Sequence, residues 1–163
     1  MRSIRTSAIA AGLLALTATA GQAQSGSIQA TATVLSAITV TGAVPLAFGA
    51  VTPGVNKTVG VAGGGRFDLV GAASANVNIA FTLPTQLTSG GNNLPIGTWT
   101  GYHNTTNNPT TGGTAFTPAA AVTPAAFSGT GALFVFVGAT VSPAPAQAAG
   151  AYTGTVQMTA AYF

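Results

Sequence analysis

Apolar and polar residues alternate at every second position over several short stretches of the chain. In one of them, Val77, Ile79 and Phe81 occupy alternate positions. A period of two places all apolar side chains on one face of an extended strand. The stretches that show this period, or an apolar run of strand length, are 28–34, 38–41, 44–48, 59–61, 67–71, 77–81, 133–137 and 156–162.

Glycine, proline and asparagine separate these stretches, and none of them shows the 3.6-residue repeat of an amphipathic helix. Short strands with frequent turn residues between them are typical of sandwiches and barrels. The region 90–124 is less regular, and we expect strands only near 94–101 and 113–117, joined by a long exposed loop. The pattern predicts a single all-β domain over 24–163, a sandwich of about eight or nine short strands.

The start of the chain has a different character. Arg2 and Arg5 are followed by an uncharged apolar run at 7–18, and 21–23 reads Gly-Gln-Ala, with small residues where a signal peptidase cleaves. This order is that of a secretory signal peptide, and the apolar run is shorter than the roughly 20 residues that cross a bilayer. We therefore expect 1–23 to be removed and the protein to be exported to the periplasm, the cell surface or the medium.

Charged residues make up only 3% of the chain, against about a quarter in ordinary domains. There is no cysteine, and His103 and Asp68 are the sole histidine and the sole acidic residue. This composition excludes paired-carboxylate catalysis, a cysteine nucleophile and a disulfide, so we expect no enzyme activity, no cofactor and no metal. Without 1–23, Lys57 and Arg66 against Asp68 leave one net positive charge, too little for a nucleic-acid surface. Arg66 is expected to pair with Asp68.

Three further segments carry a resemblance to known proteins. They are PLAFG at 45–49, GRFDLVG at 65–71 and GAYTGTVQMTAAY at 150–162, and the alternating segment 28–34 precedes them. In this order they resemble the bacterial secreted proteins of domain of unknown function 4402, and are similar to spore-coat-U-type pilin subunits of archaic chaperone–usher fimbriae. The resemblance implies an immunoglobulin-like sandwich that lacks its last strand. It also implies assembly with other copies or related subunits by strand exchange, aided by a periplasmic chaperone and an usher.

Carried onto this chain, the resemblance makes 27–35 the donor strand and 155–162 the acceptor edge, together with a strand near 38–41. Unpaired groups at a sheet edge template an added strand, and alternate side chains of that strand fill pockets. A second interpretation stays open, in which 27–35 is an ordinary first strand paired within its own domain. The donor residues are Ile28, Ala30, Ala32 and Val34, and the acceptor residues are Val156, Met158, Ala160 and Tyr162.

Two other functions are compatible with the sequence. Trp99, Tyr102, His103 and Asn104 combine aromatic faces with amide and ring nitrogen groups beside the irregular region. Such a combination can bind carbohydrate or a surface partner in a self-contained secreted sandwich. The same residues also fit a core tryptophan followed by solvated loop residues. A small outer-membrane barrel ending at Phe163 is the remaining alternative, although the strands are shorter than the roughly 9–11 residues that such barrels use.

Overall fold

The structure is a computed structural model that describes residues 24–163. The expected signal peptide, 1–23, lies outside the described residues. The chain divides into two units, Met1–Thr33 and Val34–Phe163, and every strand of the described residues belongs to the second unit.

The second unit contains ten strands and one turn of 3-10 helix, so the expected all-β fold is confirmed and the expected number of strands is too low. The helical turn η1 (Val61–Gly63) covers the end of a stretch expected to be extended. The strands are β1 (Thr39–Val44), β2 (Lys57–Val59), β3 (Gly65–Val70), β4 (Asn76–Thr82), β5 (Gln86–Ser89), β6 (Asn92–Asn104), β7 (Thr114–Phe116), β8 (Thr123–Ala126), β9 (Ala132–Val141) and β10 (Gln157–Tyr162).

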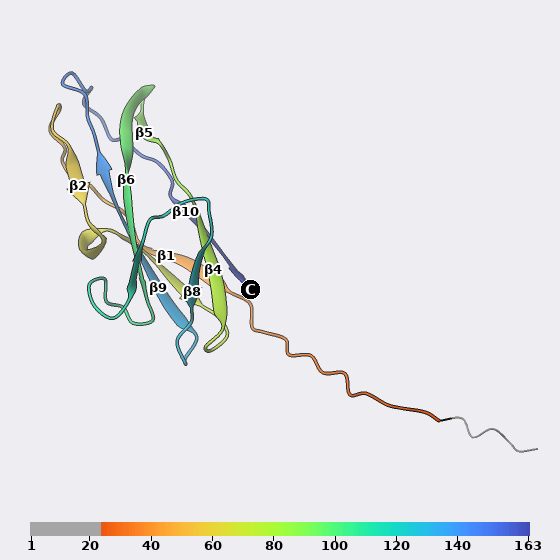
Figure 1. The fold of residues 1–163 in the computed structure, drawn as a ribbon. Coiled ribbons are helices and arrows are strands. Elements are labelled where there is room, and N and C mark those ends of the chain that lie inside the picture. The colour runs from red at the N-terminus through yellow and green to blue at the C-terminus, as the bar shows by residue number, and fades with distance from the viewer. Residues whose placement is uncertain (1–23) are drawn as a thin grey trace, which may run out of the picture. The chain divides into compact units, whose positions relative to one another are not determined.

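Antiparallel pairing arranges these strands into two sheets that form a sandwich, with β6 and β9 as its longest strands (Figure 1). The larger sheet has the order β1-β3-β9-β6-β5, with β2 also on β9 and β7 also on β6. The smaller sheet has the order β10-β4-β8. A constant-type immunoglobulin sandwich pairs strands A-B-E-D in one sheet and C-F-G in the other. The path β1-β3-β9-β6 matches the first order, and β4 and β10 match C and F.

The main core lies between the two sheets. Val77, Ile79 and Phe81 of β4 are at most 3% exposed, as their alternation predicts, and they share one buried cluster with Leu133 and Val135 of β9. Burying each such side chain contributes about 1.5–3 kcal/mol. The sandwich is therefore held together by the inward faces of β4 and β9.

The continuous apolar run in β9 reflects burial on both faces of this strand. Val135 and Val137 point into the sandwich, and Phe136, which points to the opposite face, is also only 5% exposed. On the side of β9 where Phe136 lies, η1 packs against the strand. The expectation that 133–137 is a doubly covered strand is confirmed.

Two strands lie in regions where the sequence suggested none. β5 forms a hairpin with β6, closed by Gly90 and Gly91 with φ of 53° and 85°, the backbone of a type I′ turn. β8 pairs with β4 at the edge of the smaller sheet and includes Pro124, a residue that edge strands tolerate because one side needs no N–H donor. Glycine marks a tight hairpin here, and proline marks an edge strand. The long exposed loop expected between 101 and 113 is present as 105–113, between β6 and β7.

Candidate functional site

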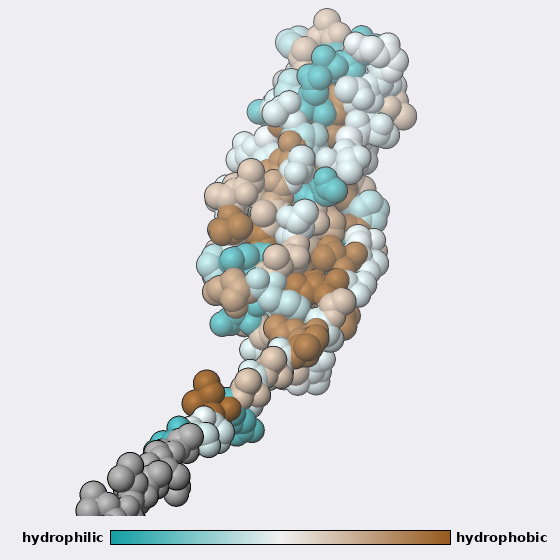
Figure 2. Space-filling view, turned by 90° about the vertical axis from the view of Figure 1, so that its right-hand side faces the viewer, coloured by the Kyte–Doolittle hydropathy of each residue, from teal (hydrophilic) through white to brown (hydrophobic). Residues whose placement is uncertain are grey.

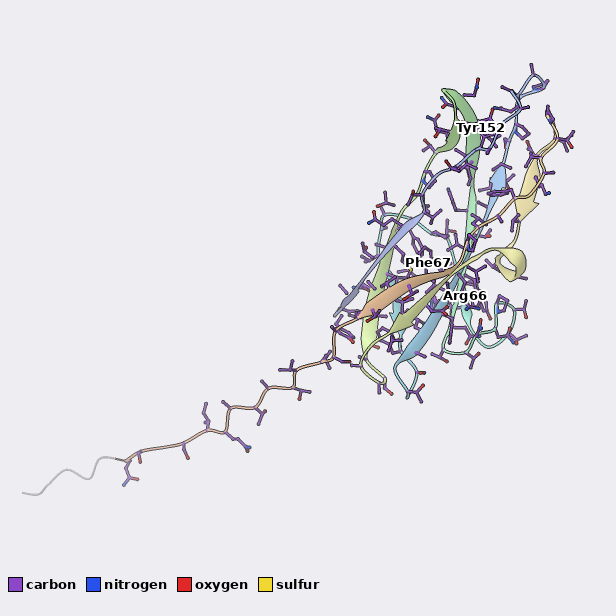
Figure 3. The ribbon with its side chains drawn as sticks, turned by 180° about the vertical axis from the view of Figure 1, so that it is seen from behind. Arg66, Phe67 and Tyr152 are labelled. Carbon is purple, nitrogen blue, oxygen red and sulfur yellow. The ribbon has the colours of Figure 1, made fainter. Side chains whose placement is uncertain are left out.

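An open groove of about 920 Å³ runs between two chain segments that lead out of β1 and into β10. The segment 42–51 forms one wall and 147–156 forms the other. Figure 3 shows Arg66 and Phe67 of β3 well apart from Tyr152, although all three line the groove. The groove is therefore long, and its shape suits an extended segment of polypeptide.

The floor of the groove is apolar. Leu94, Ile96 and Val141 belong to a second buried cluster, and Leu87 and Tyr152 pack against it. Phe67 and Val137, which also line the groove, belong to the main core. Apolar side chains are also gathered in patches on the face of the domain that Figure 2 shows. A segment lying in the groove would extend both clusters and remove apolar surface from water.

The first wall makes few backbone hydrogen bonds of its own. Within residues 24–163, the stretch 45–49 takes part in no backbone hydrogen bond. Side-chain contacts hold it instead, because Leu46 and Phe48 pack on the second cluster and Lys57 Nζ donates to Ala50 O over 2.8 Å. The N–H and C=O groups of 46–49, and the C=O of Pro45, are therefore available to an added strand.

The second wall is fastened to the larger sheet. Thr88 N–H donates to Thr153 O (2.8 Å) and Thr153 N–H donates to Thr88 O (3.0 Å), a single bridge to β5. Tyr152 Oη donates to Ala148 O over 2.8 Å and accepts a bond from Gln147 Nε2 over 2.7 Å. Gly150 approaches β5 so closely that a Cβ there would lie 2.5 Å from Ser89 Oγ. These contacts hold the second wall apart from the first.

Two strands next to the groove have an unpaired edge: β1, which lines it with Gly42 and Val44, and β10, which begins one residue after the lining ends at Val156. Within the described part of the chain, β1 pairs only with β3, and β10 pairs only with β4. In an immunoglobulin sandwich the position beside strand F is filled by strand G. Here β10 takes the position of strand F. Within residues 24–163, no strand takes the position of strand G beside it.

The predicted acceptor residues all pack on the main core. Met158 is 7% exposed, and Val156, Ala160 and Tyr162 are partly buried against the same cluster. β10 begins at Gln157, so Val156 lies one residue before it and lines the groove. The apolar side of β10 thus faces inward, and its backbone edge is open.

The predicted donor residues form no strand within their own domain. The described residues before β1, 24–38, have no regular secondary structure, and 24–37 are exposed throughout. Ile28 is 96% exposed and Val34 is 94% exposed, and Ala30 and Ala32 are exposed as well. Residues 27–35 are therefore in no strand of this structure, and β1 begins only at Thr39. The interpretation of 27–35 as an ordinary first strand paired within its own domain stays a prediction.

The residues proposed as a carbohydrate loop lie in strand β6 and not in a loop. Trp99 is partly buried and packs on both core clusters. Tyr102 Oη accepts a hydrogen bond from Gly113 N–H (2.7 Å). His103 stands 5.8 Å from the ring of Phe116, and burial lowers the pKa of this histidine below its usual 6.5. These side chains form no shared exposed surface.

Asn104 has a structural role in organising the loop that follows β6. Its side chain is 3% exposed. Its Nδ2 donates to Asn108 O (2.9 Å) and Thr111 O (2.8 Å), and its Oδ1 accepts from Thr106 N–H (3.2 Å). All the hydrogen-bonding groups of this amide face the loop, which leaves the carbohydrate interpretation without geometric support.

The predicted Arg66–Asp68 pair is confirmed. Arg66 Nε donates to Asp68 Oδ1 over 2.6 Å, and Nη2 donates to Asp68 Oδ2 over 3.1 Å. Two residues apart on β3, the two side chains share one face. Arg66 Nη1 also donates to Asn107 Oδ1 (3.0 Å). Among the described residues that line the groove, Arg66 alone is charged, and Asp68 balances it.

Residues 24–163 contain no helix with the length and apolar character needed to span a lipid bilayer. Comparison of the chain with protein families, with curated proteins and with solved structures found no match.

Proposed function

We propose that this protein is an exported, non-enzymatic subunit of a surface fibre, in which the leading segment 27–35 of one copy fills the groove of the next. The observation that carries the proposal is an apolar groove of about 920 Å³, lined by β1 residues and by the segment that leads into β10. Among residues 24–163, β1 and β10 each pair with one strand only. An added strand would form hydrogen bonds with both edges and take the position that strand G has in an immunoglobulin sandwich.

The segment 27–35 has the chemistry that this groove requires. It is exposed, and its backbone is in no strand. It carries no charge, and the groove's one charged residue, Arg66, is already paired with Asp68. Nine extended residues span about 30 Å. Ile28, Ala30, Ala32 and Val34 would point into the groove together, because alternate side chains share a face.

Repetition of this contact gives an open filament. The donor segment and the groove are different parts of the chain, so each copy can offer one and receive the other. A contact that is head-to-tail and does not close on itself continues without limit. The resemblance to fimbrial subunits supports a periplasmic chaperone and an usher as partners, and the 1–23 segment supports export.

The absence of cysteine provides a clean test. We would place one cysteine in the donor, at Ile28, Ala30, Ala32 or Val34 in turn, and a second at Ala47 on the first groove wall. A disulfide forms only when the two Cα atoms lie within about 7 Å. Export of the full-length precursor and mild oxidation should give a ladder of covalent oligomers that a reducing agent collapses.

The matched control carries the same donor cysteines with the second cysteine at Val122. This residue is 61% exposed and does not line the groove. This control protein should give no ladder. Equal ladders with Ala47→Cys and Val122→Cys, or no ladder with any donor position, would reject strand exchange.

A further inference from the structure

The last strand holds the point where the leading segment joins the domain. Tyr162, at the end of β10, donates its hydroxyl proton to Ser36 O over 2.8 Å. The same oxygen accepts a hydrogen bond from Ala72 N–H over 2.6 Å. Ser36 lies three residues before β1 and directly after the proposed donor 27–35. One side chain thus joins the end of the smaller sheet to the start of the larger one.

The position of the Tyr162 side chain is fixed by its surroundings. Its ring lies 6.0 Å from the ring of Phe127 in a tilted arrangement. Gly71 leaves room for it, because a Cβ at Gly71 would lie 2.7 Å from Tyr162 Oη. Ile38, two residues after Ser36, is partly buried against the main core. The connection 36–38 is therefore held at both ends, by the hydroxyl of Tyr162 and by the core.

This restraint bears on a competing arrangement. A donor segment so near β1 could fold back along β1's open edge and fill the groove of its own molecule. Since β1 begins at Thr39, that hairpin would have to turn within 36–38. Hairpin turns of this length need defined backbone angles at each turn residue. The turn would require Ser36 to leave Tyr162 and Ile38 to leave the core.

We infer that Tyr162 directs strand exchange to a second copy, by holding Ser36 so that the donor cannot turn back into its own groove. The inference rests on the proposed function and adds a positioning residue to it. An intramolecular donor would otherwise have a large advantage, because a short linker gives an effective concentration in the millimolar range. The Tyr162–Ser36 hydrogen bond opposes that advantage.

The test uses the pair of donor cysteine and Ala47→Cys that gives the strongest ladder. In this chain, Tyr162→Phe keeps the ring and removes both hydrogen bonds of the hydroxyl. Loss of these bonds should raise the ratio of intramolecular disulfide to ladder by about five- to thirtyfold. Non-reducing gels and the mass of the monomer band measure this ratio. Tyr102→Phe is the matched control, because it also loses one hydroxyl hydrogen bond, that from Gly113, and should leave the ratio unchanged.

A second variant tests the same inference without changing Tyr162, so it remains useful if Tyr162→Phe does not fold. Insertion of Gly-Gly-Ser between Leu35 and Ser36 leaves Tyr162 and Ser36 in contact and supplies a free turn ahead of them. It should also raise the intramolecular product. An unchanged ratio in either folded variant would overturn the role of Tyr162 while leaving strand exchange intact. If the parent chain, with both cysteines and the native Tyr162, formed no cross-link, strand exchange itself would be overturned.

Discussion

Thr153 exchanges two backbone hydrogen bonds with Thr88, at 2.8 Å and 3.0 Å, and this pair fastens the second groove wall to the larger sheet. Four residues later the chain enters β10, which belongs to the smaller sheet. The chain therefore passes from one sheet to the other along the length of the groove. This crossing forms the second wall of the groove and leaves β10 paired with β4 alone among the strands of residues 24–163.

Thr153→Pro should loosen this wall and weaken assembly. Proline lacks the N–H that bonds to Thr88, and its ring restricts the backbone. We expect a loss of about 1–3 kcal/mol in the binding of a donor strand, measured as a shorter disulfide ladder in the chain with a donor cysteine and Ala47→Cys. Thr88→Val keeps the backbone bonds and should leave the ladder as it is. An unaffected ladder in Thr153→Pro would show that the bridge does not shape the groove.

Substitutions in the main core should reduce stability far more than those at the surface. Ile79 is fully buried between the sheets, so Ile79→Ala leaves a cavity and should cost about 2–5 kcal/mol of unfolding free energy. Val122, at 61% exposed, provides the comparison, and Val122→Ala should change stability by less than about 0.5 kcal/mol. Urea unfolding of both variants measures the difference. Similar losses for the two would contradict the assignment of the core.

Alternation predicts β4 and β10 and their buried faces, and a continuous apolar run predicts β9, because all three strands place side chains in the main core. In Val77, Ile79 and Phe81 the burial seen in the structure follows the sequence pattern residue by residue. The local sequence pattern does not predict a segment's structure where strand formation depends on a pairing partner. Residues 28–34 alternate as well as β4 does, and yet they form no strand, because a strand needs a pairing partner as well as an alternating pattern.

The groove could be predicted only in part. Its acceptor side was visible in the alternation of Val156 and Met158, but its second wall, 147–156, has no strand pattern and depends on one bridge to Thr88. For Trp99, the local sequence pattern and the structure disagree. An aromatic residue next to amides indicates a binding loop in sequence, and only the pairing of β6 with β9 shows that this one packs inward.

Asn104→Ala should release the loop between β6 and β7. The side chain makes three hydrogen bonds with the loop backbone and is almost fully buried, so its removal leaves several backbone groups unpaired. We expect a loss of about 1–3 kcal/mol in stability and faster amide exchange over 105–112, with the ladder of covalent oligomers unchanged. Asn107→Ala, which removes only an exposed bond to Arg66, should have a smaller effect. Equal exchange rates in the two variants would argue against this role.

Stability should fall as the pH decreases below about 6.5. Burial lowers the pKa of His103 in the folded protein from its ordinary value of 6.5, so the unfolded chain binds the proton more readily. Protonation then favours unfolding, and the stabilising contribution of neutral His103 is lost as the pH falls from 6.5 through the lowered pKa. Urea unfolding between pH 7.5 and about 4.5 measures this slope. His103→Gln should flatten it, and an identical slope in His103→Gln would assign the effect to other groups.

Enlarging a groove-facing donor residue should tighten the assembly. Ala32 would point into a groove that the small side chains of 27–35 leave partly unfilled, so Ala32→Leu adds three buried carbon atoms at about 0.8 kcal/mol each. The contact should then strengthen by about tenfold or more, measured as the protein concentration at which oligomers dissociate on dilution. Thr33→Leu adds the same kind of side chain to the opposite face of the strand, where the groove offers no pocket, and should strengthen the contact much less. An equal gain in association strength for the two variants would contradict a donor that lies in the groove with alternate residues inward. Nonspecific hydrophobic association of the leading segment would then explain the oligomers.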